Sequence, residues 1–186
     1  MRSRTLLAAL LFCSFASLDV QAQMDKQMAD GKRWTTHNLD IKVLHSYCYD
    51  DKELNCIRYG RMYTWESARE ACQKVGSGWR LPTDEEWRNL SKRYGGVSAD
   101  SEDRGKAAYA ALLMGGESGF NAILGGGRSK DGEYGRLDAH GFYWTASEID
   151  ASQGWYYNFG KGGQALHRQD GGDEKTSAFS ARCVHD

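Results

Sequence analysis

The sequence predicts a mixed α+β domain, with helices in its first half and short strands in its second half. Apolar residues recur at helical spacing between residues 65 and 94. Beyond residue 115, short aromatic and apolar runs are separated by glycines, and the chain has 22 glycines against a single proline. Helices that come before strands in this way are typical of α+β folds.

The first 22 residues predict a secretory signal peptide. Arg2 and Arg4 form a basic start, residues 6–15 are almost entirely apolar, and residues 20–22 end in the small side chain that a signal peptidase recognises. The apolar run is too short to cross a bilayer as a helix. We therefore expect the mature chain to start near Gln23, without membrane insertion after cleavage. It would be secreted, periplasmic or held at the cell surface.

Charge and length restrict the class of protein. Removal of residues 1–22 takes away two arginines and one aspartate, so the formal charge moves from −1 to −2. Acidic and basic residues are interspersed, which gives no electrostatic footprint for nucleic acid. About 160 residues remain, enough for one domain with its own core. We place this domain at 32–186, after an N-terminal linker at 23–31.

Two helices are predicted in the first half of the domain. Apolar residues at helical spacing predict the first over residues 65–75, and a glycine ends it. Thr83 and Glu86 have the spacing of a capping box, which predicts the start of a second helix. This helix pair is expected to be scaffold and not a ligand site. Its expected core residues are Trp65, Leu81 and Trp87.

One strand is predicted before the helix pair in the sequence, and a third helical piece and five further strands are predicted after it. An alternating run at 32–39, anchored by Trp34, predicts an opening strand. Residues 107–114 predict a third helical piece, which two glycines stop. Apolar runs between glycines then predict strands at 120–124, 141–147, 155–159, 165–168 and 179–184.

Four of the five cysteines follow residue 22, and they allow three pairings among which sequence alone cannot choose. Chain physics favours a local hairpin clip between Cys48 and Cys56, around a turn at 50–52, and a long bridge between Cys72 and Cys183. Loop-closure entropy gives the long bridge about 4–5 kcal/mol of stabilisation. A zinc site is the competing interpretation. No Cys-x-x-Cys pair occurs and the histidines lack ligand spacing, so no metal is predicted.

Four motifs follow one another along the chain: CYDDKELNCIRYGRMYTWESA, GWRLPTDEEW, GFYWTASE and FSARCV. They resemble the Fibrobacter succinogenes major paralogous domain, a family of exported bacterial domains, and the resemblance extends from about residue 32 to the C-terminus. The segment TWESAREACQKVGSGWRLPTDEEW is also similar to the helix pair of C-type lectin-like domains. Its RLPTDEEW part is similar to the formylglycine-generating enzymes, which share that fold.

The resemblance implies a C-type lectin-like fold, in which two helices pack on short, mostly antiparallel strands with long Gly-rich loops. It places Cys72 and Cys183 at the long bridge of that fold. It also places Cys48 and Cys56 where long-form members clip an N-terminal hairpin.

The resemblance does not bring a sugar-binding or catalytic site with it. The calcium-dependent C-type lectins bind sugars through Glu-Pro-Asn or Gln-Pro-Asp followed by Trp-Asn-Asp, and none of these tripeptides occurs here. Formylglycine-generating enzymes use two late cysteines that bind copper, whereas only Cys183 is late in this chain. The acidic runs 100–103 and 170–174 offer oxygen ligands for calcium. Solvated loops are the more frequent explanation, so we predict a non-catalytic protein without a cofactor.

The glycine-rich second half carries the predicted ligand surface. Residues 125–141 form a long excursion of the kind that carries function on a rigid scaffold. Tyrosine, tryptophan and arginine are the usual anchors of binding surfaces. The same side chains would equally serve to tie down long loops through hydrogen bonds. The contacts predicted between residues 125 and 172 are Arg128, Tyr134, Arg136, Tyr156 and Arg168.

Three functions are compatible with the sequence. The first is an exported, non-catalytic recognition module that binds a glycan or protein ligand at the bacterial cell surface or outside the cell. The second is a structural or assembly component of an envelope complex. The third is a degenerate enzyme of the formylglycine-generating type. Glycan-array binding would favour the first, pull-down of an abundant partner the second, and copper-dependent oxidation of a substrate cysteine the third.

Overall fold

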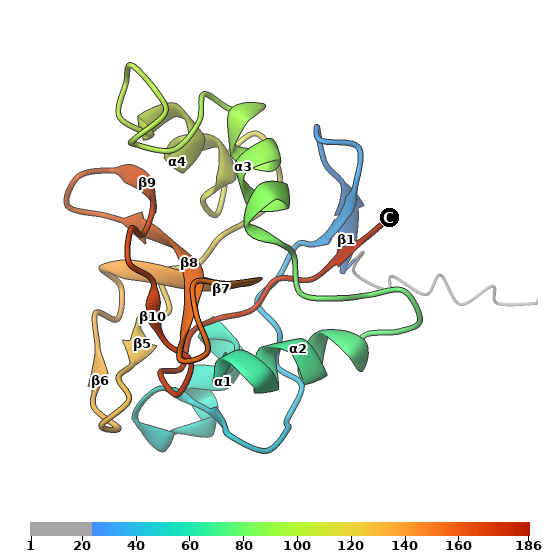
Figure 1. Ribbon diagram of the computed structural model, residues 1–186, viewed down its shortest axis with the longest axis vertical. Coiled ribbons are helices and arrows are strands. Elements are labelled where there is room, and N and C mark those ends of the chain that lie inside the picture. The colour runs from blue at the N-terminus through green and yellow to red at the C-terminus, as the bar shows by residue number, and fades with distance from the viewer. Residues whose placement is uncertain (1–23) are drawn as a thin grey trace, which may run out of the picture.

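The computed structural model describes residues 24–186, so the predicted signal peptide at 1–22 lies outside the described residues. Within this range the chain is the mixed α+β domain that the sequence predicts, with four α-helices and several small antiparallel sheets. Figure 1 shows α1 and α2 on one side of strands β7 and β8, and α3 and α4 on the other side. No helix among residues 24–186 is long and apolar enough to cross a bilayer.

The two ends of the described chain meet in one small sheet. Strand β2 (Arg33–Thr35) pairs on one edge with β1 (Asp25–Gln27) and on the other with the last strand, β11 (Val184–His185). The opening strand predicted at 32–39 is therefore confirmed but shorter. Strand β1 lies in the segment expected to be a linker. Its polar sequence DKQ carries no strand pattern, and its pairing with β2 makes it part of the sheet.

The segment around the first disulfide differs from the predicted hairpin. Strands β3 (Ser46–Tyr47) and β4 (Met62–Tyr63) pair with each other, and between them lie a 3-10 turn (Tyr49–Asp51) and helix α1 (Glu53–Tyr59). The Cys48–Cys56 disulfide is confirmed, but it joins a turn to a helix and not two strands. Sequence periodicity missed α1 because its apolar side chains are divided between two faces: Leu54 and Ile57 are each 78% exposed, whereas Cys56 and Tyr59 are buried.

The remaining helices are α2 (Trp65–Gln73), α3 (Asp84–Lys92) and α4 (Lys106–Leu112), in agreement with the three predicted. The capping box at the start of α3 is present. The Glu86 amide donates to Thr83 Oγ1 at 3.2 Å, and the Thr83 amide donates to Glu86 Oε2 at 2.8 Å. As predicted for a scaffold, Trp65, Leu81 and Trp87 are all buried.

The second half of the chain is built on one antiparallel sheet. Strand β8 (Gln153–Gly160) pairs with β7 (His140–Glu148) on one edge, and with β9 (Ala165–Arg168) and β10 (Asp173–Glu174) on the other. A separate hairpin consists of β5 (Gly127–Arg128) and β6 (Tyr134–Gly135). The strands predicted at 141–147, 155–159 and 165–168 are confirmed. The strands predicted at 120–124 and 179–184 are not continuous. In the first only Ala122 forms a bridge, to Leu113. In the second Phe179 and Ser180 bridge to Tyr63 and Tyr143, and Val184 lies in β11.

Both faces of the β7–β8 sheet are buried, each in its own aromatic core. On one face Tyr143 and its cross-strand partner Tyr157 pack with Trp87. On the other face Trp144 packs against Phe179, with ring centroids 4.5 Å apart. Alternation along a strand thus sends neighbouring large side chains into different cores.

The C-terminal segment links these cores. The Cys72–Cys183 disulfide is confirmed; it ties α2 to the residue before β11, and both cysteines are fully buried. The neighbouring Arg182 is also fully buried, and burial lowers the pKa of its guanidinium. Its nitrogens donate to Asn38 Oδ1 and to backbone oxygens of three further residues, at 2.6–3.0 Å. These backbone acceptors belong to Thr35, Phe120 and Asn121.

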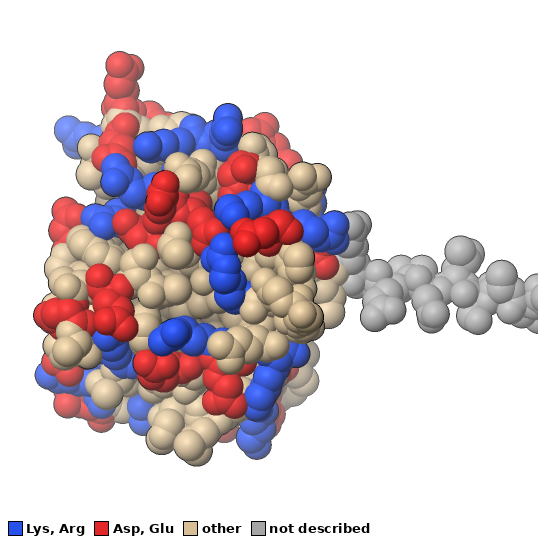
Figure 2. All heavy atoms as spheres, turned by 45° about the vertical axis from the view of Figure 1, so that its right-hand side comes forward, with Lys and Arg blue, Asp and Glu red and all other residues tan. Residues whose placement is uncertain are grey.

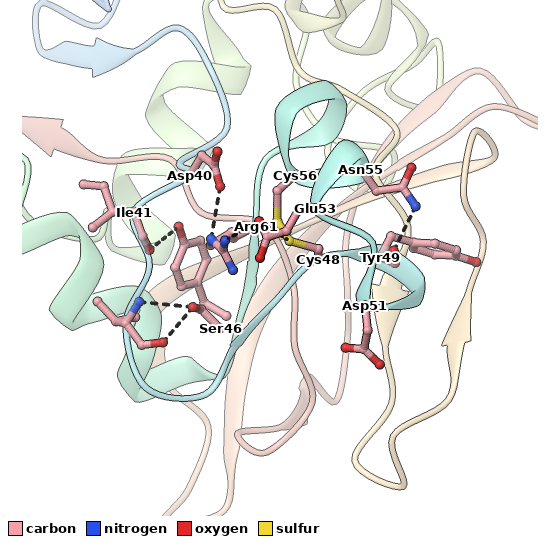
Figure 3. The surroundings of a disulfide bond; sticks show 12 residues. Asp40, Ile41, Ser46, Cys48, Tyr49, Asp51, Glu53, Asn55, Cys56 and Arg61 are labelled. Atoms are coloured by element: carbon pink, nitrogen blue, oxygen red, sulfur yellow. Dashed lines mark hydrogen bonds and ion pairs between the residues drawn. A yellow bond between two sulfur atoms is a disulfide. The ribbon is translucent and has the colours of Figure 1, made fainter.

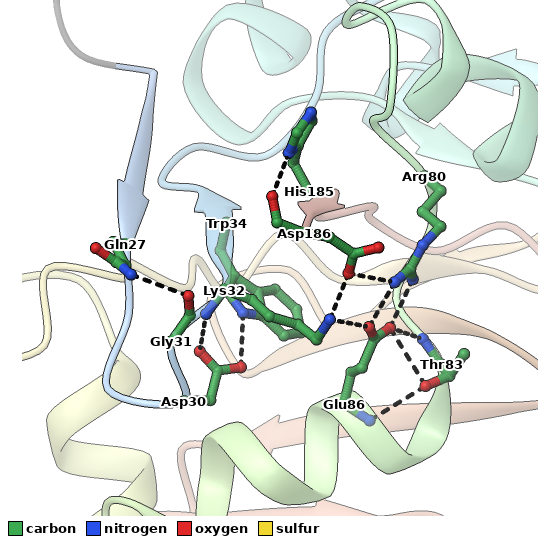
Figure 4. Close-up of polar contacts among 10 residues, drawn as sticks. All are labelled: Gln27, Asp30, Gly31, Lys32, Trp34, Arg80, Thr83, Glu86, His185 and Asp186. Carbon is green, nitrogen blue, oxygen red and sulfur yellow. Dashed lines mark hydrogen bonds and ion pairs between the residues drawn. The ribbon is translucent and has the colours of Figure 1, made fainter.

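A cluster of four charged side chains lies where Asp186 approaches the first turn of α3 (Figure 4). Arg80 donates to both carboxylate oxygens of Glu86 at 2.7 Å, and Lys32 contacts Glu86 at 3.3 Å and Asp186. Burial alone would raise the pKa of Glu86. Hydrogen bonds from Arg80, from the Thr83 backbone and from Lys32 outweigh burial and lower it.

Truncation of Trp87 tests whether the helix pair is scaffold. The indole stacks on Tyr157 with centroids 5.0 Å apart and lies in a fully buried cluster. We expect Trp87→Ala to lower the free energy of unfolding by about 3–5 kcal/mol, measured by urea denaturation. A variant of unchanged stability that has lost only ligand binding would contradict the assignment.

Acid titration tests the role of Glu86. Because its folded-state pKa is lowered, its stabilisation is complete above its unfolded pKa of about 4.3 and is lost as pH falls through the folded value. We expect Glu86→Gln to be less stable than the wild type at pH 7, with the difference narrowing below about pH 4. Thermal unfolding over this pH range measures it, with the exposed Glu85→Gln as control. A difference that does not depend on pH would show that Glu86 acts through packing alone.

Candidate ligand-binding site

A hollow of about 390 Å³ lies beside the β5–β6 hairpin and is called the hairpin hollow here. Its floor is aromatic and comes from three separate parts of the chain: Phe142 of β7, Tyr156 of β8, and Phe179. The ring of Phe179 lies 5.0 Å from that of Phe142 and 4.8 Å from that of Tyr156. The three rings therefore form a continuous aromatic surface. The hollow is open to solvent on one side, from which a ligand could reach these rings.

Two glycines keep side chains away from this floor. Gly127 and Gly135 are directly paired across the hairpin, so their Cα–H groups project to the same face. A Cβ at Gly127 would lie 2.9 Å from a carbon of Phe142 and 3.0 Å from a carbon of Phe179. A Cβ at Gly135 would meet no atom within 4 Å. Gly127 lets the hairpin approach the floor, and Gly135 leaves space above it.

Charged groups of both signs surround the hollow, and several already have partners. Lys130 in the hairpin turn pairs with Glu174 of β10 at 2.6 Å. Asp173 accepts hydrogen bonds from the Ser177 hydroxyl at 2.8 Å and from the Glu174 amide. Arg136 is exposed and makes no ion pair or side-chain hydrogen bond with residues 24–186. Neither sign dominates the lining, and Figure 2 shows the same mixing of charges over another face of the molecule.

The phenol of Tyr156 is a hydrogen-bond donor available at the floor. Burial, and then the negative charge of Asp173, raise the pKa of Tyr156 to about 12. The hydroxyl is therefore protonated at neutral pH. It has no hydrogen-bond partner among residues 24–186, although the ring is half-buried. An aromatic ring face and an unpaired donor thus occur on the same side chain.

The structure separates the five predicted contacts. Arg128, Arg136 and Tyr156 all line the hairpin hollow. The Arg128 guanidinium, however, points to the opposite face of the hairpin, where it lies 4.2 Å from the centre of the Tyr47 ring. Tyr134, its cross-strand partner, projects to that same opposite face. Three of the five predicted residues therefore line the hollow. Of these, only Arg136 and Tyr156 line it with their side chains.

Arg168 lies away from the hollow. Its Nε donates to Asp84 Oδ1 at 2.7 Å, and its guanidinium lies 3.4 Å from the centre of the Trp155 ring. These contacts connect β9 to the start of α3. The contacts of Arg168 therefore fit the alternative stated for the sequence, in which these side chains hold the loops in place through hydrogen bonds and do not contact a ligand.

Sequence reasoning missed most of the floor. Phe142 and Tyr156 each precede a fully buried tyrosine, but alternation does not indicate which face of a strand is covered. Phe179 belongs to a run that predicted a core strand. A signal was available for Phe142 alone, which falls in the predicted strand that directly follows the glycine-rich excursion.

One group of three potential metal ligands lies close together within residues 24–186: Cys48, Glu53 and Cys56. Figure 3 shows Glu53 beside the disulfide that joins the two sulfurs. Glu53 Oε2 also accepts a hydrogen bond from Arg61 at 2.9 Å. Because the disulfide occupies both sulfurs and an arginine faces the carboxylate, this group has no free set of ligands to offer a cation.

Comparison with known families gives a match over most of the chain. The sequence profile of the Fibrobacter succinogenes major domain matches residues 20–185. The match therefore includes both disulfides, the helix pair and the hairpin hollow. No curated protein matches the chain.

Two arginines that the sequence could not distinguish should differ in their effect on stability. Arg136 is exposed and unpaired, so Arg136→Ala should change the free energy of unfolding by less than about 0.5 kcal/mol. Arg168 is bonded to Asp84 and stacked on Trp155, so Arg168→Ala should cost about 1–3 kcal/mol. Thermal unfolding of both variants decides this. Equal losses would mean that the two positions are wrongly assigned.

Proposed function

The chain belongs to the Fibrobacter succinogenes major domain family, and from this premise we propose that it is an exported, non-catalytic recognition module that binds a glycan in the hairpin hollow. Two disulfides support export, because disulfides persist in oxidising compartments outside the cytoplasm. The observation that carries the binding proposal is the open aromatic floor with its unpaired Tyr156 hydroxyl.

A saccharide fits the chemistry of this floor. A sugar ring has apolar C–H faces that pack against aromatic rings, and its hydroxyls both donate and accept hydrogen bonds. The hollow offers the rings of Phe142, Tyr156 and Phe179 and, around them, donors and acceptors of both charges. Ligand sites commonly combine an apolar lining with a few polar groups that fix orientation. The balance of charge favours a ligand without strong net charge.

We also propose a C-type lectin-like fold for the domain. The supporting features are the helix pair α2–α3, the pairing of the first and last strands through β2, and the long bridge from α2 to the residue before the last strand. The hairpin hollow then belongs to the long-loop half of the domain. Such loops carry function while the packed half holds them in place.

Helix α1 supports a second candidate function, that of a structural or assembly component of an envelope complex. Leu54 and Ile57 lie one turn apart on this helix, and each is 78% exposed. Adjacent exposed aliphatic side chains on one helix are a feature of surfaces that meet another protein. Under this alternative the fixed partner, and not a glycan, would be recovered with the protein.

A leucine placed in the hollow tests the proposed site. Gly135 does not have a positive φ and its Cβ position is open, so Gly135→Leu fills the hollow at little cost to the fold. We expect the variant to lose at least tenfold in affinity for any glycan that the wild type binds on a glycan array, while its melting temperature stays nearly unchanged.

The matched control is Gly162→Leu, in the turn between β8 and β9. This glycine also has an open Cβ position without a positive φ, and it does not line the hollow. Binding should survive in the control. Unchanged binding by Gly135→Leu would place the ligand elsewhere, and the absence of any glycan binding by the wild type would contradict the proposed function.

A further inference from the structure

The face of the β5–β6 hairpin turned away from the hollow rests on the segment that the Cys48–Cys56 disulfide closes. The Tyr134 hydroxyl donates to Asp51 Oδ1 at 2.6 Å. The Tyr134 ring lies 5.3 Å from that of Tyr49. The Arg128 guanidinium lies over Tyr47, and a Cβ at Gly126 would lie 2.9 Å from a ring carbon of Tyr49. Hairpin and disulfide-closed segment are therefore packed side by side.

This support is itself held in an unusual backbone conformation. Asp50 and Asp51 have φ angles of 54° and 55°, in the left-handed region that residues other than glycine seldom adopt. The Asp51 amide donates to the Cys48 carbonyl at 2.9 Å. Asn55 of α1 donates to the Tyr49 carbonyl at 2.8 Å, as Figure 3 shows. Together with the disulfide, these bonds fix the position of the Asp51 carboxylate.

The outer strand of the hairpin depends on this support more than the inner strand does. Strand β5 is bonded to the C-terminal segment, since the amide and carbonyl of Arg128 both bond to Ala178. Among residues 24–186, strand β6 pairs with β5 alone. The side chain of Tyr134 is thus the direct link from β6 to the disulfide-closed segment.

We propose that Tyr134 is a positioning residue: it makes no contact with ligand, but holds β6 against the Cys48–Cys56 segment and so keeps the hairpin hollow open. The part that concerns the hollow as a ligand site rests on the proposed function. The part that concerns the hairpin does not. Tyr134, which the sequence suggested as a ligand contact, then acts on binding through Gly135, its neighbour in the strand that lines the hollow.

Hydrogen exchange of the hairpin tests the positioning role without any ligand. Tyr134→Phe keeps the ring stack and removes the donor to Asp51, so peptides covering residues 127–137 should exchange about fivefold faster. Asp51→Asn retains an acceptor oxygen and a residue type that tolerates a positive φ, so its exchange should resemble that of the wild type. Replacement of both Cys48 and Cys56 by serine should also speed exchange of the hairpin.

Tyr157→Phe is the matched control. It removes another tyrosine hydroxyl bonded to an aspartate, at 3.1 Å from Asp84 Oδ1, on the far face of the sheet. It should leave exchange of the hairpin unchanged. Unchanged exchange in Tyr134→Phe, or equal acceleration in Tyr157→Phe, would overturn the positioning role.

The glycan array gives a second, separate readout. If Tyr134 positions the hairpin, Tyr134→Phe should weaken binding about fivefold and Asp51→Asn should leave it intact. Weaker binding by Tyr134→Phe with unchanged exchange would mean direct ligand contact and would overturn the inference. If the wild type binds no glycan, the proposed function fails, while the exchange experiment still decides whether Tyr134 positions the hairpin.

Discussion

The structure depends on the burial of one cation, Arg182, in the middle of the domain. Among residues 24–186 no carboxylate pairs with it; its charge is met by Asn38 and by three backbone carbonyls. A buried cation is tolerated only when its hydrogen bonds are satisfied, so these four acceptors must converge at one place. They come from the last residue of β2, from Asn38 just after it, and from the loop that follows α4. The C-terminal segment therefore organises parts of the chain that are far apart in sequence.

The same segment builds the hollow. The residues just before Arg182 alternate between neighbours: Ala178 bonds to β5, Phe179 forms part of the aromatic floor, and Ser180 bridges to β7. The same stretch of backbone thus serves both the buried core and the hollow. Its side chains face in different directions, with Arg182 in the core and Phe179 in the floor of the hollow. The hairpin above the floor contributes no residue to either buried core cluster of the described chain.

Local signals were sufficient to predict helices α2, α3 and α4 and the long strands. The capping box at Thr83 marked the start of α3, and aromatic runs between glycines marked β7, β8 and β9. Helix α1 escaped detection because its buried residues, Cys56 and Tyr59, share no apolar stripe with its exposed ones. The site was predicted only in part, since Tyr156 and Phe179 meet through tertiary packing. Arg168 pairs with Asp84, which precedes it by 84 residues, and no local pattern shows such a partner.

Chemical denaturation of Arg182→Met tests this account most directly. Methionine fills much of the same space but donates no hydrogen bond, so three backbone carbonyls in the core would lose the Arg182 donor and Asn38 Oδ1 would keep only the hydrogen bond from the Tyr143 hydroxyl. We expect the free energy of unfolding to fall by about 3–5 kcal/mol, in a single transition followed alike by tryptophan fluorescence and far-ultraviolet circular dichroism. A loss below about 1 kcal/mol, or a separate early transition confined to one core, would contradict the organising role of Arg182.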